Sequence, residues 1–98
     1  MNVVKRLEII VSSRELPLIL EKLDQSGVRG YSVIRDVIGK GDGGKVSDDF
    51  DFVSTTLSNV YILSFCDEEK TSCILEKIRP LLQKFGGACY ISDSVEVL

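Results

Sequence analysis

The chain has 98 residues, of which 44% are hydrophobic and 28% are charged, so it is long enough for one small domain with a modest core. Twelve basic and fifteen acidic side chains give a net charge of −3, which argues against nucleic-acid binding because such domains normally carry a positive field. The absence of histidine excludes histidine-ligated zinc and nucleophiles activated by histidine.

The N-terminal segment does not resemble a secretion signal, because charged residues interrupt its apolar run. No stretch reaches the roughly 18 apolar residues that a membrane-spanning helix needs. The three cysteines, Cys66, Cys73 and Cys89, match no metal-binding or redox spacing, so we expect reduced, buried thiols. These features predict a cytoplasmic protein without direct membrane insertion.

The first half of the chain predicts a strand, a helix and a second strand. Residues 3–11 predict a strand. One of its faces is expected to carry Val3, Leu7, Ile9 and Val11, and the other Val4, Arg6, Glu8 and Ile10. Apolar side chains at helical spacing over 16–23 predict a helix, which serines can cap and which Gly27 ends. Residues 30–38 are rich in β-branched side chains and predict a second strand.

Residues 39–56 have no hydrophobic periodicity and are rich in glycine and aspartate, so we expect one long mobile loop. Its glycines would let backbone N–H groups approach an anion, with Lys40 and Lys45 as nearby charges. A flexible loop without a ligand accounts for the same composition more simply. Exposed aromatic side chains in polar loops often contact a partner, so Lys45, Phe50 and Phe52 are candidates for partner binding, unless the two rings fold back onto the domain.

The second half predicts a strand over 57–66, a helix after Asp67, and a strand over 88–98 that follows a turn at Gly86 and Gly87. Pro80 should kink or break the helix. Its core side chains are expected to be Cys73, Ile74, Ile78, Leu81, Leu82 and Phe85. The order βαββαβ predicts a single α+β domain with a ferredoxin-like fold, in which two helices cover one face of a four-stranded antiparallel sheet.

The expected strands carry apolar residues on both faces, although two helices can cover only one. Ile34 opposes Val33, and Tyr61 and Leu63 oppose Ile62. A sheet that is apolar on both sides requires a second cover, most simply other copies of the chain. We therefore expect a homo-oligomer.

Several segments in order resemble the PII signalling proteins, most closely the PII-like proteins that accompany cyanobacterial bicarbonate transporters. Residues 26–33, Ser-Gly-Val-Arg-Gly-Tyr-Ser-Val, and 39–41, Gly-Lys-Gly, resemble the family's second strand and the start of its T-loop. Residues 5–10, 57–60 and 90–98 resemble its first strand, the end of its T-loop and its last strand. The resemblance implies a homotrimer that binds adenine nucleotides between subunits and whose T-loop engages a membrane transporter, an enzyme or a regulator.

The resemblance also implies a set of nucleotide-binding residues from three parts of the chain. Near the base would lie Ile10 and Ser32, near the phosphates Gly39, Lys40 and Gly41, and along the cleft, as the B-loop, Gly86 and Gly87.

The sequence departs from the family pattern where charge is concerned. Ala88 stands where PII proteins have a phosphate-binding lysine, and the family's C-terminal arginines have no counterpart up to Leu98. The stretch from Ser32 to Gly39 is one residue longer than the pattern, and the shorter T-loop lacks the tyrosine that is uridylylated in other members. With fewer cations, we expect AMP, cyclic AMP or ADP as the ligand, and no required cofactor or metal.

Other readings remain open. A ligand-free structural trimer of the same fold is favoured by Ala88, and the CutA ion-tolerance proteins share the trimeric architecture. An enzyme is not expected, because no nucleophile stands beside a plausible base and no acid pair is recognisable by spacing. An RNA-binding domain of the same topology is disfavoured by the acidic balance.

Overall fold

The computed structural model describes residues 1–38 and 58–98. The elements are β1 (Asn2–Ser12), α1 (Leu16–Gln25), β2 (Tyr31–Val37), β3 (Asn59–Cys66), α2 (Thr71–Phe85) and β4 (Ala88–Glu96). Short 3-10 turns at Ser13–Glu15 and Glu68–Lys70 precede the two helices. The predicted ferredoxin-like order is confirmed, and the strand bounds differ from the predicted ones by at most two residues at either end.

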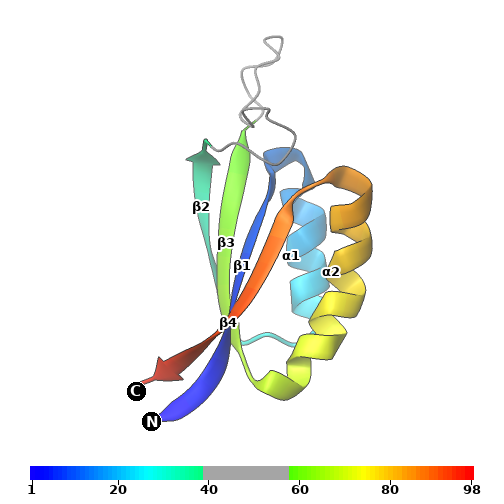
Figure 1. Ribbon diagram of the computed structural model, residues 1–98. Coiled ribbons are helices and arrows are strands. Elements are labelled where there is room, and N and C mark those ends of the chain that lie inside the picture. Colours follow the sequence, from blue (N-terminus) through cyan, green and yellow to red (C-terminus); the bar gives the residue numbers. More distant parts are fainter. Residues whose placement is uncertain (39–57) are drawn as a thin grey trace.

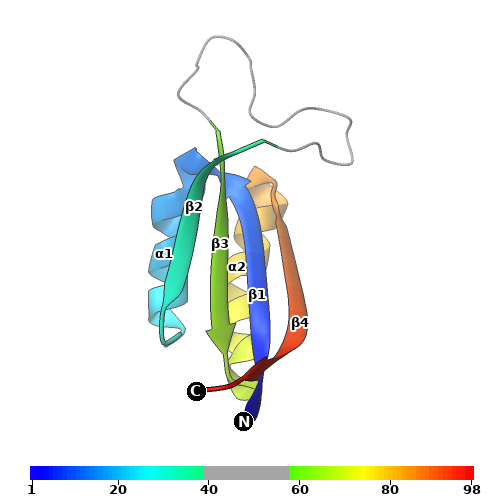
Figure 2. The same ribbon diagram turned by 90° about the vertical axis from the view of Figure 1, so that its left-hand side faces the viewer.

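The four strands form one antiparallel sheet in the order β2-β3-β1-β4. Both helices lie on the same face of this sheet (Figure 1), and in residues 1–38 and 58–98 no helix covers the opposite face (Figure 2). The core lies between helices and sheet, and its members are Leu7, Ile9, Val11, Leu16, Ile19, Leu23, Val60, Ile62, Cys66, Ile74 and Ile78. We call the opposite side the open face.

The helices form where the sequence predicts them. Pro17 lies in the first turn of α1, where its missing N–H costs little, and Gly27 follows the helix with a φ of 77°. Helix α2 continues through Pro80 to Phe85, so the helix does not break there. Proline removes only one backbone donor, and packing of Ile78 and Leu82 against the core holds the following turn.

Three side chains lie elsewhere than the pattern predicts. Val3 is 69% exposed, because the outer ends of β1 and β4 bend away from the helices (Figure 1) and leave its face uncovered. Val4, on the opposite face of the strand, is buried. Cys73 and Phe85 are exposed rather than in the core, since they flank the stripe centred on Ile74 and Ile78.

Strand β2 contains a bulge. Ile34 pairs with Tyr61 and Val37 pairs with Asn59, so β2 has one residue more than β3 across this interval. Asp36 lies there with a φ of 60°, a left-handed conformation that aspartate tolerates better than most side chains. The bulge thus adds one residue to β2 within the stretch that we expect to be one residue longer than the PII pattern.

The cysteines occupy three different environments: Cys66 is buried, Cys89 is partly buried and Cys73 is exposed. Burial raises the pKa of the Cys66 and Cys89 thiols above the usual cysteine value, because a thiolate is poorly solvated there. Only Cys66 and Cys89 therefore fit the expected buried thiols.

We expect iodoacetamide at pH 8 to label Cys73 at least about tenfold faster than Cys66 or Cys89, because exposure and thiolate content set the rate. Mass spectrometry of the labelled peptides measures the three rates. In urea the three rates should converge, and equal rates in the folded protein would contradict the structure.

Folding raises the pKa of the Cys66 and Cys89 thiols, so the free energy of unfolding should fall as pH rises above the ordinary cysteine pKa.

Candidate ligand site

Gly86 and Gly87 form the turn between α2 and β4 and lie against the end of β1. Gly86 donates its N–H to the carbonyl oxygen of Leu82 at 2.8 Å, and both glycines have a positive φ. A Cβ atom at Gly87 would lie 2.7 Å from the carbonyl oxygen of Ile10. Only glycine therefore fits at 87, and the turn brings two of the predicted nucleotide-binding residues, Ile10 and Gly87, into contact.

Ser32 lies on β2, opposite Leu63 of β3, and both side chains point to the open face. They line an open depression of ≈ 370 Å³, together with Phe65 and the ion pair Arg29–Glu96. The depression combines apolar walls with hydroxyl groups, which suits a flat, partly polar ring better than a compact anion.

One chain does not bring these two parts of the predicted site together. Ser32 lies on the edge strand β2, whereas Gly87 leads into β4 at the opposite edge of the sheet. Three strand spacings separate the edges, which amounts to at least roughly 14 Å. A ligand shorter than this distance cannot contact both Ser32 and Gly87 of one chain.

The other predicted site residues, Gly39, Lys40, Gly41, Lys45, Phe50 and Phe52, lie outside the described residues. The residues that flank this stretch, Ile38 and Ser58, lie at the same end of the sheet as Ile10 and Gly87 (Figure 2). Ser58 accepts a hydrogen bond from the Ser13 N–H at 2.6 Å and donates its hydroxyl to Asp36 at 3.2 Å. These bonds fix the positions at which the chain leaves and rejoins the sheet.

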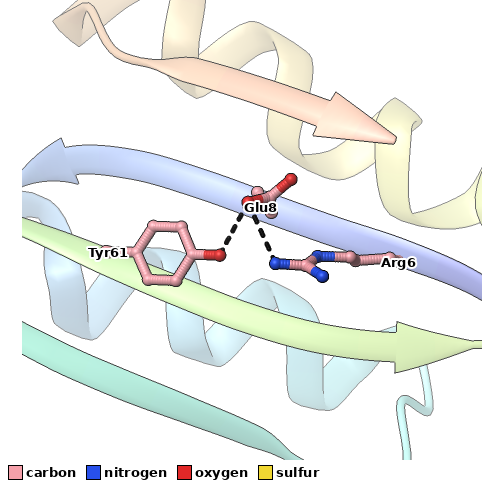
Figure 3. Close-up of polar contacts among 3 residues, drawn as sticks. All are labelled: Arg6, Glu8 and Tyr61. Atoms are coloured by element: carbon pink, nitrogen blue, oxygen red, sulfur yellow. Dashed lines mark hydrogen bonds and ion pairs between the residues drawn. The ribbon is translucent and has the colours of Figure 1, made fainter. Parts of the chain in front are cut away.

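Three polar side chains gather at the centre of the open face (Figure 3). Tyr61 donates its hydroxyl to Oε2 of Glu8 at 2.7 Å, and Nη2 of Arg6 lies 3.4 Å from the same oxygen. The contact with Tyr61, and then the charge of Glu8, raise the pKa of Arg6. Sequence reasoning placed Arg6 and Glu8 on one face of β1 but missed the network, because Tyr61 joins it only through the pairing of β1 with β3.

The end of β4 reaches across the sheet. Arg29 precedes β2 and Glu96 ends β4, yet their side chains form an ion pair at 3.5 Å, although the two strands are at opposite edges. Figure 2 shows the C-terminal segment crossing in front of β1 on the open face. The depression around Ser32 is therefore closed on one side by Glu96.

In residues 1–38 and 58–98, no group of three His, Cys, Asp or Glu side chains could hold a metal ion. In the same part of the chain, neither helix is long and apolar enough to cross a membrane.

We expect Gly86→Ala to lower the free energy of unfolding by about 1–3 kcal/mol, because its backbone conformation is strained for any other residue. Gly87→Ala should cost about 1–3 kcal/mol more, since its methyl group would also meet the Ile10 carbonyl. Urea unfolding of both variants measures the difference, and Gly86, with no atom within 4 Å of a new Cβ, is the matched control. Equal losses would contradict the close approach of this turn to β1.

The fold is shared with solved structures. The PII-like protein CPII of Thiomonas intermedia K12, in a structure bound to ADP, AMP and bicarbonate, matches with a TM-score of 0.84 and 26% identity over 95% of this chain and 87% of that one. A putative PII-like signalling protein of Thermus thermophilus matches with a TM-score of 0.69 and 18% identity over 96% and 91%. GlnK of B. subtilis matches with a TM-score of 0.59 and 10% identity over 95% and 86%.

A search of curated protein sequences finds no match. The sequence does match the family described as Nitrogen regulatory protein P-II, over residues 4–98. This match begins within β1 and includes every later strand and helix, so the chain belongs to the PII family of regulatory proteins.

Proposed function

We propose that the protein is a non-enzymatic homotrimeric sensor that binds an adenine nucleotide between subunits and acts on a transporter or an enzyme through residues 39–56. The observation that carries the proposal is the separation of Ser32, on the edge strand β2, from the Gly87 turn, which leads into β4 at the other edge of the sheet. Each chain offers two half-sites, and assembly in a closed ring would join the β2 half-site of one copy to the Gly87 half-site of the next.

The chemistry of the two half-sites supports a nucleotide. Ser32, Leu63 and Phe65 offer a partly apolar depression for a base. At the Gly86–Gly87 turn the backbone is not shielded by side chains, so it can approach an anion closely. The Thiomonas protein, at 26% identity, is described with ADP, AMP and bicarbonate bound.

The distribution of charge favours a nucleotide with few phosphates. Ala88, opposite Ile10 at the start of β4, offers no cation beside the turn. Lys84, the basic residue of the last helical turn, has its ammonium group 5.2 Å from the ring centre of Phe85. AMP, cyclic AMP or ADP thus suits the site better than ATP, because each additional phosphate needs its own cation or metal.

A trimer is supported by the open face, where Ile34 is 56% exposed and Tyr90 is 60% exposed. A monomer would leave these side chains in water, so burial against other copies is favourable. The alternative of a ligand-free scaffold with the same assembly is favoured by one observation, the missing cation at Ala88. The match to the PII family supports a regulatory role more than the ion tolerance of CutA proteins.

Calorimetric titration with AMP, cyclic AMP, ADP and ATP, with and without magnesium and bicarbonate, tests the ligand. We expect saturable binding near one nucleotide per chain, weakened about tenfold by Lys40→Ala through loss of a charge-assisted contact. Lys22→Ala, on α1 and on the other side of the sheet from Ser32, is the charge-matched control. No heat from any nucleotide would leave the scaffold as the surviving interpretation.

A mixing experiment tests whether each site is made by two copies. Ser32→Leu fills the base depression and Ala88→Glu places an acid beside the Gly86–Gly87 turn, so each variant alone should lose nucleotide binding. Trimers reassembled from an equal mixture should regain about a quarter of the sites, because some junctions then combine two native halves. If the mixture binds no more than the separate variants, the two halves do not belong to a site shared between copies.

A further inference from the structure

The Arg6–Glu8–Tyr61 network sits at the middle of the open face, on the two central strands of the sheet. Around it, the same face presents Ile34 of β2, Phe65 of β3 and Tyr90 of β4, each more than a third exposed. A cation and an anion therefore lie side by side within an otherwise largely apolar, uncovered surface.

The network is incomplete within one chain. Nε of Arg6 is buried but has no hydrogen-bond partner in the described ranges 1–38 and 58–98. Its Nη2 contact with Glu8 is long at 3.4 Å, and both contacts to Glu8 end on the same oxygen, Oε2. A guanidinium has five donors in a rigid fork that matches a carboxylate with two bonds, a geometry that these neighbours on one strand do not reach.

Arg6 and Glu8 give the open face one positive and one negative group, so the open faces of two copies can be electrostatically complementary. Arg6 and Glu8 are two residues apart on one strand and keep 40% and 31% of their side chains exposed. When copies face one another around a rotation axis, the positive group of one can meet the negative group of the next, and the net charge of the contact remains zero.

We propose that Arg6 and Glu8 form ion pairs between copies of this chain and thereby set the rotational register of the assembly on the open face. The inference rests on the homo-oligomer of the proposed function and adds the residues that determine its specificity. Apolar side chains such as Ile34 and Phe65 supply non-directional attraction, which leaves the register undefined. A buried ion pair does define it, because a slipped register leaves both charges without partners.

Charge reversal tests the proposal. Arg6→Glu puts two acids on the face of every copy, and Glu8→Arg puts two cations there. Each variant alone should need roughly 100-fold more protein to assemble, because like charges meet at the interface. In a trimer of the two variants, at most two of the three contacts join an acidic face to a basic one. An equal mixture should therefore assemble at a lower protein concentration than either variant alone, although less readily than the wild type. Light scattering after size-exclusion chromatography gives the masses, and circular dichroism confirms that each variant is folded.

Lys5→Glu is the matched control. Lys5 is adjacent to Arg6 on β1 and carries the same charge, but it lies on the other face and pairs with Asp93 at 2.6 Å. Its reversal should leave the oligomer unchanged.

The outcomes separate this inference from the function on which it rests. A wild-type protein that is monomeric at every concentration overturns both the homo-oligomer and the register. A wild-type oligomer whose two reversed variants assemble as readily as the wild type overturns the inference alone, as does a mixture that assembles no better than the separate variants. If the reversed variants are unfolded, Arg6→Lys and Glu8→Gln replace them: both should weaken assembly about tenfold or more, and unchanged assembly overturns the inference.

Discussion

The burial of Leu7 and Ile9 beneath α1 and α2 is the interaction on which the other elements depend. Both side chains have no exposed area, and β1 lies between β3 and β4 in the sheet. Because alternate residues of a strand point to opposite faces, the burial of Leu7 and Ile9 directs Arg6, Glu8 and Ile10 to the open face. A shift of one residue would exchange the two sets and place a charged pair in the core, so the register of β1 is strongly determined.

The same arrangement places Ser32 at one edge of the sheet and the Gly87 turn at the other. Ile10 meets the Gly87 turn on the β4 side, while Ser32 lies in the depression on the β2 side. In residues 1–38 and 58–98, no helix crosses the open face, and the end of β4 that does cross it pairs with Arg29 rather than joining Ser32 to the Gly87 turn. Assembly of copies would therefore bring the two parts together. The proposed sensor would thus couple ligand binding to assembly, since a nucleotide held by two copies stabilises their contact by mass action.

The open face carries both apolar side chains, which favour association, and polar side chains, which can make association specific. Its apolar side chains favour association, whereas Arg6, Glu8 and Tyr61 add a polar centre that a purely apolar surface would not need. Buried ion pairs contribute little net stability compared with apolar groups of similar volume, and specificity is the role best supported in other systems. In the proposed assembly, such a polar centre would also limit nonspecific association through the exposed side chains of Ile34 and Tyr90.

The sequence alone predicted the element order, the helix-facing stripes at Leu16, Ile19 and Leu23, and the two-faced strands, because period and local chemistry specify these features. It also placed Ile10 and Gly87 in one predicted site, through the resemblance to the PII proteins. Tertiary structure decided which odd-numbered residues of β1 are covered: Val3 is exposed because the strand end bends away from the helices. Tertiary structure also decided the exposure of Cys73, the bulge at Asp36, and the meeting of Glu8 with Tyr61, 53 residues away. Periodicity describes one element at a time, whereas these features depend on where a neighbouring strand or helix ends, which only the packed chain defines.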